Sequence, residues 1–257
     1  MSNGNALELD VRDFENSGAQ ENMADNWEKE EGMLDKPSMN IIFLLDTSGS
    51  MRNERINQLN YAMPIALEAA NDAAEQNEAD LFVRIIEFNS SPKWILGTAE
   101  KGVPGKDARS QWHDLKAGGT TDTAAAIELS LKCLHTEYLG IRNYHPVVIL
   151  ITDAKSDERT MTQSSIEKLR MALSGGLAEK KDKVWRFAIG VQNYNEPELL
   201  EFASLGTKED EYGNEQNGVP MIFKVDDLGS LSKVLKNVTV SSLLSNAKGD
   251  DNPIVPI

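Results

Sequence analysis

Two kinds of hydrophobic pattern alternate along most of the chain. Continuous apolar runs indicate strands covered on both faces, and we predict such strands over residues 39–46, 79–89, 145–153, 183–191 and 219–226. Between them, apolar residues recur at three- and four-residue steps, which is typical of helices with one buried face. The helices are expected over residues 53–76, 122–139, 164–173, 196–205 and 228–244.

This alternation of strand and helix predicts an α/β fold: a doubly wound, mostly parallel central sheet with helices on both faces. In such a sheet a ligand site forms at the carboxyl ends of the strands. Two of the most apolar predicted strands end in acids, Asp46 and Asp153. We therefore expect both carboxylates at the same edge of the sheet.

The N-terminal region differs from the rest of the chain. Residues 12–36 have no sustained apolar period and are predicted to be a solvated extension. Before them, Leu7, Leu9 and Val11 alternate with polar residues, which fits either a short edge strand or a disordered arm. We divide the chain into an acidic extension (1–36), one folded domain (37–242) and a C-terminal tail (243–257).

Charge and composition exclude some classes of partner. The 257 residues carry a formal net charge of −15, which is unsuited to holding nucleic acid or an anionic membrane by electrostatics. Residues 1–36 contribute ten acidic and three basic side chains, so this segment has the densest negative charge. A single cysteine, no long apolar run and no secretory signal favour a cytoplasmic protein.

The sequence DTSGS at residues 46–50 is the strongest candidate for chemistry, and several enzyme classes fit it poorly. The chain has neither the Gly-x4-Gly-Lys-Ser/Thr loop of phosphate binders nor a Gly-x-Ser-x-Gly elbow, and its three histidines lie in no triad signature. A phosphoryl-transfer aspartate at Asp46 is an alternative. Enzymes of that kind have a second carboxylate two residues later, where this chain has Ser48.

A divalent metal site suits these residue types better. Hydroxyl and carboxylate oxygens are hard ligands for Mg²⁺, Mn²⁺ or Ca²⁺. Ser48 and Ser50 lie two apart in a turn that Gly49 allows to bend, and Asp153 adds a second acid. The segment AGGTTDT supplies further hydroxyls at a helix start. The alternative is that these serines only cap the following helix.

Three separated motifs resemble those of von Willebrand factor type A domains over residues 38–242. DTSGS resembles the Asp-x-Ser-x-Ser signature, GTTDTAAAI the threonine loop, and VVILITDAKSD the strand that ends in an acid. The resemblance implies a metal-ion-dependent adhesion site in which Ser48, Ser50 and Thr121 bind the ion directly, with Thr120 as the alternative threonine. Asp46 and Asp153 are implied to act largely through water. Ala124 and Ala154 replace glycines that are common in the family.

The resemblance implies a binding module rather than an enzyme. A cation held mainly by hydroxyls attracts a carboxylate from a protein partner. Among intracellular relatives the chain looks most like the bacterial TerY-type group, which is associated with tellurite resistance and stress and is often encoded beside a protein kinase and a PP2C-like phosphatase. A subunit of a metal chelatase or an AAA+ ATPase complex is an alternative. The acidic extension either aids solubility or supplies competing carboxylates.

Overall fold

A mostly parallel sheet forms the centre of the computed structural model, which describes residues 36–134, 144–153, 184–210, 212–250 and 253–256. Its strands follow the order β3-β2-β1-β5-β6-β9, and β4 pairs with β2 beside β3. Their bounds are Ser38–Asp46 (β1), Asp80–Phe88 (β2), Pro92–Leu96 (β3), Val103–Pro104 (β4), Val147–Thr152 (β5), Trp185–Val191 (β6) and Ile222–Val225 (β9). Only β3 and β4 run antiparallel to their neighbour β2, so the predicted α/β fold class is confirmed.

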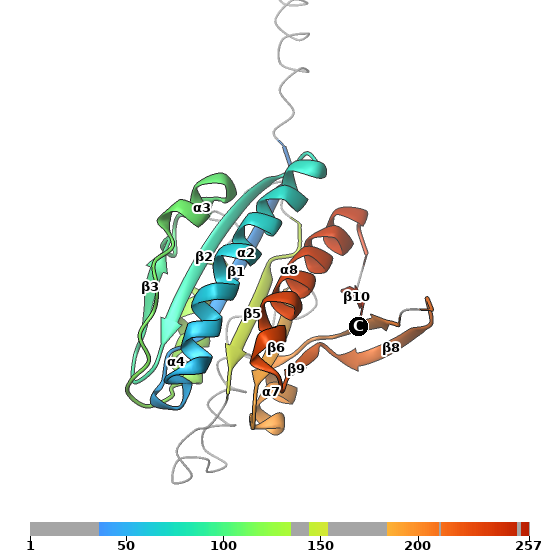
Figure 1. Ribbon diagram of the computed structural model, residues 1–257. Coiled ribbons are helices and arrows are strands. Elements are labelled where there is room, and N and C mark those ends of the chain that lie inside the picture. The colour runs from blue at the N-terminus through green and yellow to red at the C-terminus, as the bar shows by residue number, and fades with distance from the viewer. Residues whose placement is uncertain (1–35, 135–143, 154–183, 211, 251–252, 257) are drawn as a thin grey trace, which may run out of the picture. The chain divides into compact units, whose positions relative to one another are not determined.

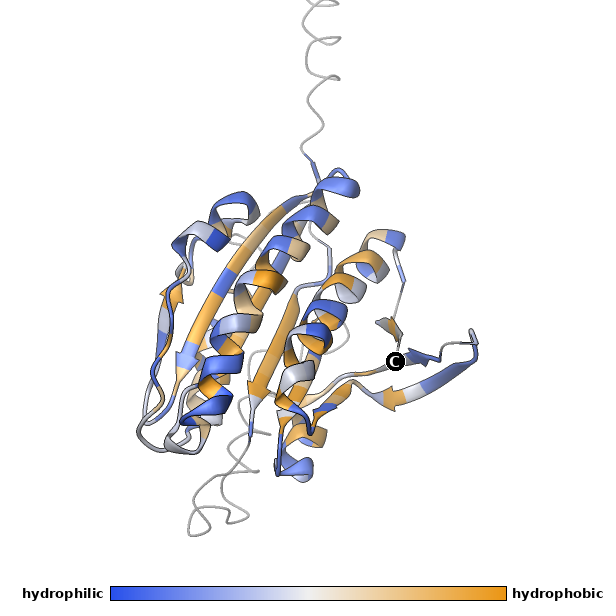
Figure 2. Ribbon diagram, in the orientation of Figure 1, coloured by the Kyte–Doolittle hydropathy of each residue, from blue (hydrophilic) through white to orange (hydrophobic). Residues whose placement is uncertain are grey.

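Helices cover both faces of this sheet. On one face, α2 (Glu54–Gln76) and α8 (Leu231–Lys248) lie side by side (Figure 1). On the other face, α4 (Thr123–Leu131) and α7 (Glu196–Phe202) contribute to a second hydrophobic cluster. The short α3 (Gly105–Gln111) packs beside β2 and α2. Figure 2 shows hydrophobic residues concentrated on the central strands, with α2 and α8 alternating in polarity.

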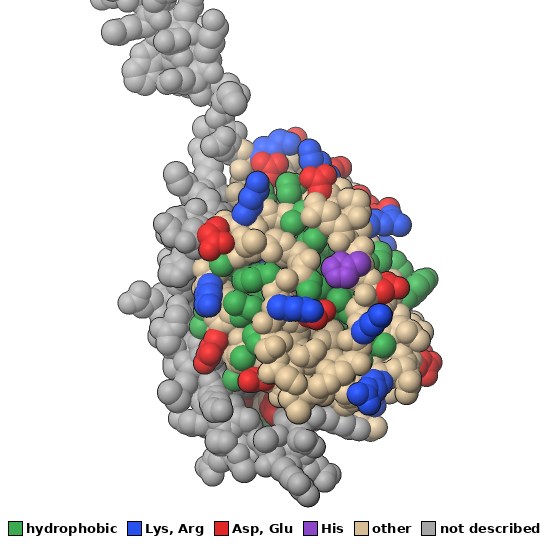
Figure 3. Space-filling model, turned by 90° about the vertical axis from the view of Figure 1, so that its left-hand side faces the viewer, with side chains coloured by type: hydrophobic (Ala, Val, Ile, Leu, Met, Phe, Trp, Pro, Cys, Tyr) green, Lys and Arg blue, Asp and Glu red, His purple; other side chains and the backbone are tan. Residues whose placement is uncertain are grey.

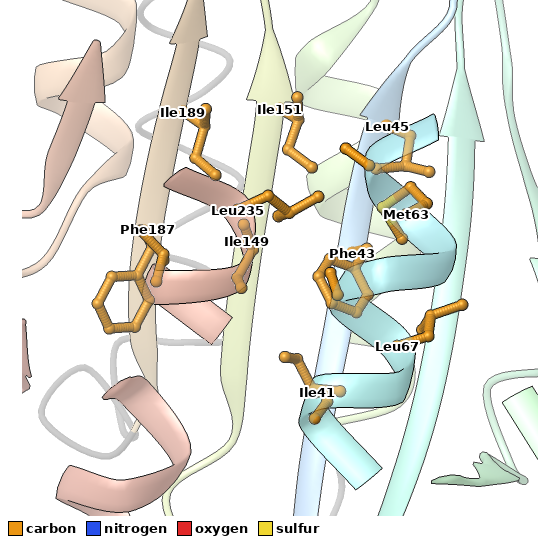
Figure 4. Close-up of a cluster of buried hydrophobic side chains, with 14 of the residues drawn as sticks. Ile41, Phe43, Leu45, Met63, Leu67, Ile149, Ile151, Phe187, Ile189 and Leu235 are labelled. Atoms are coloured by element: carbon orange, nitrogen blue, oxygen red, sulfur yellow. The ribbon is translucent and has the colours of Figure 1, made fainter. Parts of the chain in front are cut away.

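The alternation of side chains along β1 explains this two-sided core. Ile41, Phe43 and Leu45 belong to the cluster beneath α2 and α8, whereas Ile42 and Leu44 belong to the opposite cluster. Figure 4 shows the first set together with residues of β5, β6 and both helices. A strand buried on both faces is apolar at most of its positions, which is the pattern that the sequence predicted for β1.

Most predicted elements are present within a few residues of their predicted bounds. The α2 helix continues through Pro64, and β1, β2, β5 and β6 match the predicted strands. The helix predicted over 122–139 is observed as α4, which ends at Leu131, and residues 135–139 of the prediction lie outside the described residues. The helix predicted over 164–173 and the strand suggested for residues 7–11 lie outside the described residues. No helix within the described ranges is long and apolar enough to cross a membrane.

The largest correction concerns a second sheet of three strands. It contains β7 (Leu205–Glu209), β8 (Glu215–Pro220) and β10 (Ile254–Pro256) in the order β10-β7-β8. The strand predicted over 219–226 is therefore wrong as one element. Its first two residues end β8, and β9 begins only at Ile222. The N–H of Met221, between the two strands, bonds to Ser204 and marks this change of sheet.

The same sheet changes how neighbouring segments are interpreted. The helix predicted over 196–205 ends at Phe202, since β7 begins at Leu205. Residues 208–218 are mostly polar, yet they contain parts of the β7–β8 hairpin. The predicted tail 243–257 also differs: α8 continues to Lys248, and β10 pairs with β7. A Cβ on Gly206 would lie 2.6 Å from the Pro253 carbonyl oxygen, which is why glycine is required at this close approach.

The surface of the domain near α3 and β3 carries both charged and hydrophobic side chains. Figure 3 shows basic and acidic side chains on this side, with hydrophobic side chains between them. Trp94 on β3 and Trp112 after α3 are both partly buried and pack against the two hydrophobic clusters. These tryptophans are therefore mainly packing residues.

Candidate metal centre

The parallel pairing of β1 with β5 brings Asp46 beside Thr152. Leu45 pairs with Ile151, so the next residue of each strand meets at the carboxyl edge. Thr152 Oγ1 donates to Asp46 Oδ2 at 2.6 Å, and the Ser48 N–H donates to Asp46 Oδ1 at 2.8 Å. Asp46 is fully buried, and this burial raises its pKa to about 6, because desolvation outweighs the hydrogen bonds that favour the carboxylate.

Three side-chain oxygens, from Ser48, Ser50 and Asp153, form a row at the DTSGS turn. Ser48 Oγ is 3.0 Å from Ser50 Oγ, and Ser50 Oγ donates to Asp153 Oδ1 at 2.8 Å. Neighbouring ligands of an octahedral cation at about 2.1 Å lie about 3 Å apart. The spacing and the chemistry of this row therefore fit a hard divalent cation.

The loop that carries Thr121 is held against the DTSGS turn by main-chain hydrogen bonds. The Gly49 N–H donates to the Gly119 carbonyl at 2.9 Å, and the Gly118 N–H donates to the Thr47 carbonyl at 2.8 Å. The neighbouring β2–β3 connection also holds this loop through Ser90, whose Oγ lies 3.1 Å from Thr120 Oγ1.

This anchoring separates the two candidate threonines. Thr120 is exposed, and its hydroxyl is engaged with Ser90. Thr121 is half-buried, and its hydroxyl makes no hydrogen bond with other described residues. Asp122 is used as the N-cap of α4, where its Oδ1 accepts from the Ala125 N–H at 3.0 Å. Thr121 is therefore the hydroxyl left available in this loop.

An arginine that the sequence analysis did not identify completes the site. Arg55 Nη1 donates to Asp153 Oδ2 and to the Ser50 carbonyl, both at 2.7 Å. Its Nε donates to Gln192 Oε1 at 3.1 Å. Asp153 is fully buried, and the Arg55 side chain is 15% exposed, so the guanidinium is a close and partly desolvated counter-charge.

Two signals pointed to these additional residues. Arg55 lies in the first turn of α2, where the helix dipole disfavours a cation. An arginine at this position therefore suggests that another group, such as a carboxylate, binds its side chain. Gln192 and its neighbour Asn193 both have positive φ angles, 41° and 30°, which few residues other than glycine adopt. The position of Arg55 at a helix start can be read from the sequence, whereas the positive φ angles can be known only from the structure.

Four of the five predicted residues are thus connected directly. Asp46 bonds to Ser48, and the row Ser48–Ser50–Asp153 completes the group. Thr121 joins them through its loop rather than through a side-chain contact. Ala124 lies within α4, while Ala154 is outside the described residues. The described ranges hold no group of three or more His, Cys, Asp or Glu side chains, so any cation here depends on hydroxyls.

Comparison with known proteins identifies the family and the fold of the chain. Residues 40–237 match the family model of the von Willebrand factor type A domain. A von Willebrand factor type A structure from Catenulispora acidiphila is 16% identical with a TM-score of 0.57, covering 80% of this chain and 43% of that one. The PilB minor pilin of Streptococcus sanguinis is 12% identical with a TM-score of 0.60, covering 83% and 63%.

A third structure is proximal thread matrix protein 1 from the mussel byssus, described as having a zinc-occupied MIDAS motif. It is 19% identical with a TM-score of 0.54, covering 81% of this chain and 48% of that one. At these identities the three structures support the fold alone, and the chain spans less than two thirds of each. No curated protein matches the chain. The family model covers most of the sequence, so the chain belongs to the von Willebrand factor type A domain family.

Proposed function

We propose that the chain is a protein-interaction module that depends on a divalent cation. Asp46, Ser48, Ser50, Thr121 and Asp153 would hold Mg²⁺, or else Mn²⁺ or Ca²⁺, at the carboxyl edge of the sheet. The observation that carries this proposal is the row of Ser48, Ser50 and Asp153 oxygens at 2.8–3.0 Å spacing. Following the family resemblance, the hydroxyls bind directly and the carboxylates act mainly through water.

The charges around the site favour an acidic partner. Asp46 and Asp153 contribute two negative charges when ionised, and Arg55 offsets one of them through its bond to Asp153. A bound divalent cation would supply a positive centre that the surrounding side chains do not fully neutralise, which attracts a carboxylate. The body of the chain is acidic, so this attraction acts at short range.

The surroundings of Asp46 argue for binding rather than phosphoryl transfer. Each of its oxygens accepts a hydrogen bond, from Thr152 Oγ1 and from the Ser48 N–H, and its side chain is fully buried. A nucleophilic carboxylate needs an oxygen that a substrate can reach. Asp46 is better suited to holding the DTSGS turn in place. We accordingly propose a non-enzymatic role.

The finer biological assignment rests on the sequence resemblance. We propose a cytoplasmic, TerY-like role in a bacterial stress or signalling system, with a kinase or PP2C-type phosphatase system as the source of the partner. Service in a chelatase or an AAA+ ATPase complex is the alternative within the same class of metal-dependent binding.

Calorimetric titration with Mg²⁺ and Mn²⁺ tests the metal site. One saturable site is expected in the native chain and none in Ser48→Ala/Ser50→Ala. The matched control is Ser91→Ala/Ser110→Ala, two exposed serines outside the site, which should bind as the native chain does. Equal binding by the site variant, or no binding by the native chain, would overturn the proposal. Hydrolysis of a phosphate ester that is lost in Asp46→Asn but kept in Ser48→Ala would favour the enzyme instead.

A further inference from the structure

A cavity of about 500 Å³ lies between the second sheet, β9 and α8, and none of the proposed metal ligands lines it. In Figure 1 this region is where β10 lies beside α8. Five apolar residues contribute to its walls: Ile222, Phe223, Val234, Val238 and Val255. Its volume falls within the range of about 300–1,000 Å³ that is typical of small-molecule sites.

Three lysines give this cavity a positive lining in a strongly acidic chain: Lys208, Lys224 and Lys233. Lys224 already has a carboxylate partner, since its Nζ lies 3.2 Å from Glu196 Oε1. Lys208 and Lys233 form no salt bridge with any described residue. Two lysines without a salt-bridge partner among the described residues therefore line a cavity whose other walls are mainly apolar, with Ser230 and Asn237 as further polar residues.

Lys208 is held in a defined position by its own contacts. Its Nζ donates to the Ile222 carbonyl at 2.7 Å and lies 4.8 Å from the centre of the Phe223 ring. The side chain is half-buried, and burial, together with the nearby Lys224, lowers its pKa. An ammonium has three donors, and only one is used here, so the group retains capacity for a ligand oxygen.

From this arrangement we infer that the cavity binds a small organic acid with an apolar body. The acid group contacts Lys208 and Lys233, and the apolar body lies against Phe223, Val234 and Val238. The ligand supplies the counter-charge that the described residues do not provide for these two lysines. This inference does not rest on the metal site, and its test is run in chelator so that the two proposals can fail separately.

Titration with decanoate, well below its micelle-forming concentration, is the direct experiment, with 1-decanol as the neutral compound of the same chain length. Saturable one-to-one binding of decanoate is expected, and binding of decanol should be weaker by about tenfold or more, because a charge-assisted hydrogen bond is lost. Val234→Phe, which fills the cavity without changing charge, should abolish binding of both compounds. Equal affinity for the acid and the alcohol would overturn the proposal.

Charge variants then locate the acid group. Lys208→Gln and Lys233→Gln are each expected to weaken decanoate binding by about tenfold, whereas Lys236→Gln, an exposed residue of α8 that does not line the cavity, should stay within about twofold. Lys233 is exposed, so its variant is informative even if Lys208→Gln fails to fold. Undiminished binding by Lys233→Gln, or absence of saturable binding by the native chain, would refute the site.

Discussion

Arg55 Nη1 lies 2.7 Å from Asp153 Oδ2, so one of the two acids at the proposed metal site already has a cationic partner within the chain. Ser50 binds the other oxygen of the same carboxylate. Arg55 thus both orients Asp153 and places a positive charge close to where a cation would bind. These two effects oppose each other for metal affinity, and they can be separated by substitution.

For Arg55→Gln we expect tighter Mg²⁺ binding and a less stable metal-free protein. Removing a unit charge about 5 Å from a divalent cation changes affinity by about tenfold even at a water-like dielectric constant. Loss of one partner of a largely buried ion pair costs about 2–4 kcal/mol. Calorimetry and urea unfolding measure the two effects. Arg52→Gln is the control, because Arg52 is an exposed neighbour without an ion pair among the described residues. Weaker Mg²⁺ binding in Arg55→Gln would show that orientation outweighs charge.

Metal should stabilise the folded chain. If the cation binds only the folded state, a hundredfold excess over Kd adds about 2.7 kcal/mol to the free energy of unfolding. The melting temperature should rise with Mg²⁺ and fall again with chelator. In Ser48→Ala/Ser50→Ala it should respond to neither, and a metal-dependent shift retained in that variant would place the ion elsewhere.

Thr152→Val should destabilise the protein by about 1–3 kcal/mol, because it leaves a buried oxygen of Asp46 without its side-chain donor. Thr152→Ser retains the hydroxyl and should recover most of the loss. Urea unfolding of the three proteins in chelator measures the effect without contribution from metal. Equal losses in the valine and serine variants would assign the cost to packing of the methyl group.

The only cysteine should be unreactive in the folded protein. Cys133 is buried, its Sγ donates to the Ser130 carbonyl at 3.0 Å, and burial raises its pKa to about 11. At pH 8 about 0.1% of such a thiol is ionised, and the thiolate is the reactive form. Modification by a disulfide reagent should be slow in native protein and fast in urea. Rapid labelling without denaturant would show that the α4 region opens readily.

The sequence placed Asp46 and Asp153 at one edge of the sheet correctly, because this placement follows from topology. Asp46 and Asp153 end neighbouring parallel strands, so their proximity needed only the apolar runs before them. Arg55 was missed because its role depends on the direction in which its long side chain leaves the first turn of α2. The spacing of residues along the sequence does not specify that direction. Gln192 was missed because its position depends on a positive φ angle, which a glutamine in the sequence does not indicate.

The second sheet was missed for a different reason. Its strands are short and mix polar with apolar residues, so the predicted helix over 196–205 included the first residue of β7, and β8 was not recognised as a separate strand. The decisive feature is pairing between segments far apart in sequence, Leu205–Glu209 with Ile254–Pro256. Local pattern carries little information about such contacts. Gly206, with Pro253 against it, was the one residue whose identity reflected them.

The hydrogen bonds that join the DTSGS turn to the threonine loop affect how the site can change during evolution. Both bonds run between main-chain atoms, from Gly49 to Gly119 and from Gly118 to Thr47. Substitution of Ser48, Ser50 or Thr121 alters the ligand chemistry without removing these two bonds. The restriction falls instead on Gly49 and Gly119. A Cβ on Gly49 would lie 3.1 Å from the Gly119 carbonyl oxygen, and a Cβ on Gly119, whose φ is +82°, would lie 2.7 Å from Ser90 Oγ. A descendant of this chain that exchanged or lost the proposed ion could therefore keep the same loop architecture, with Gly49 and Gly119 retained.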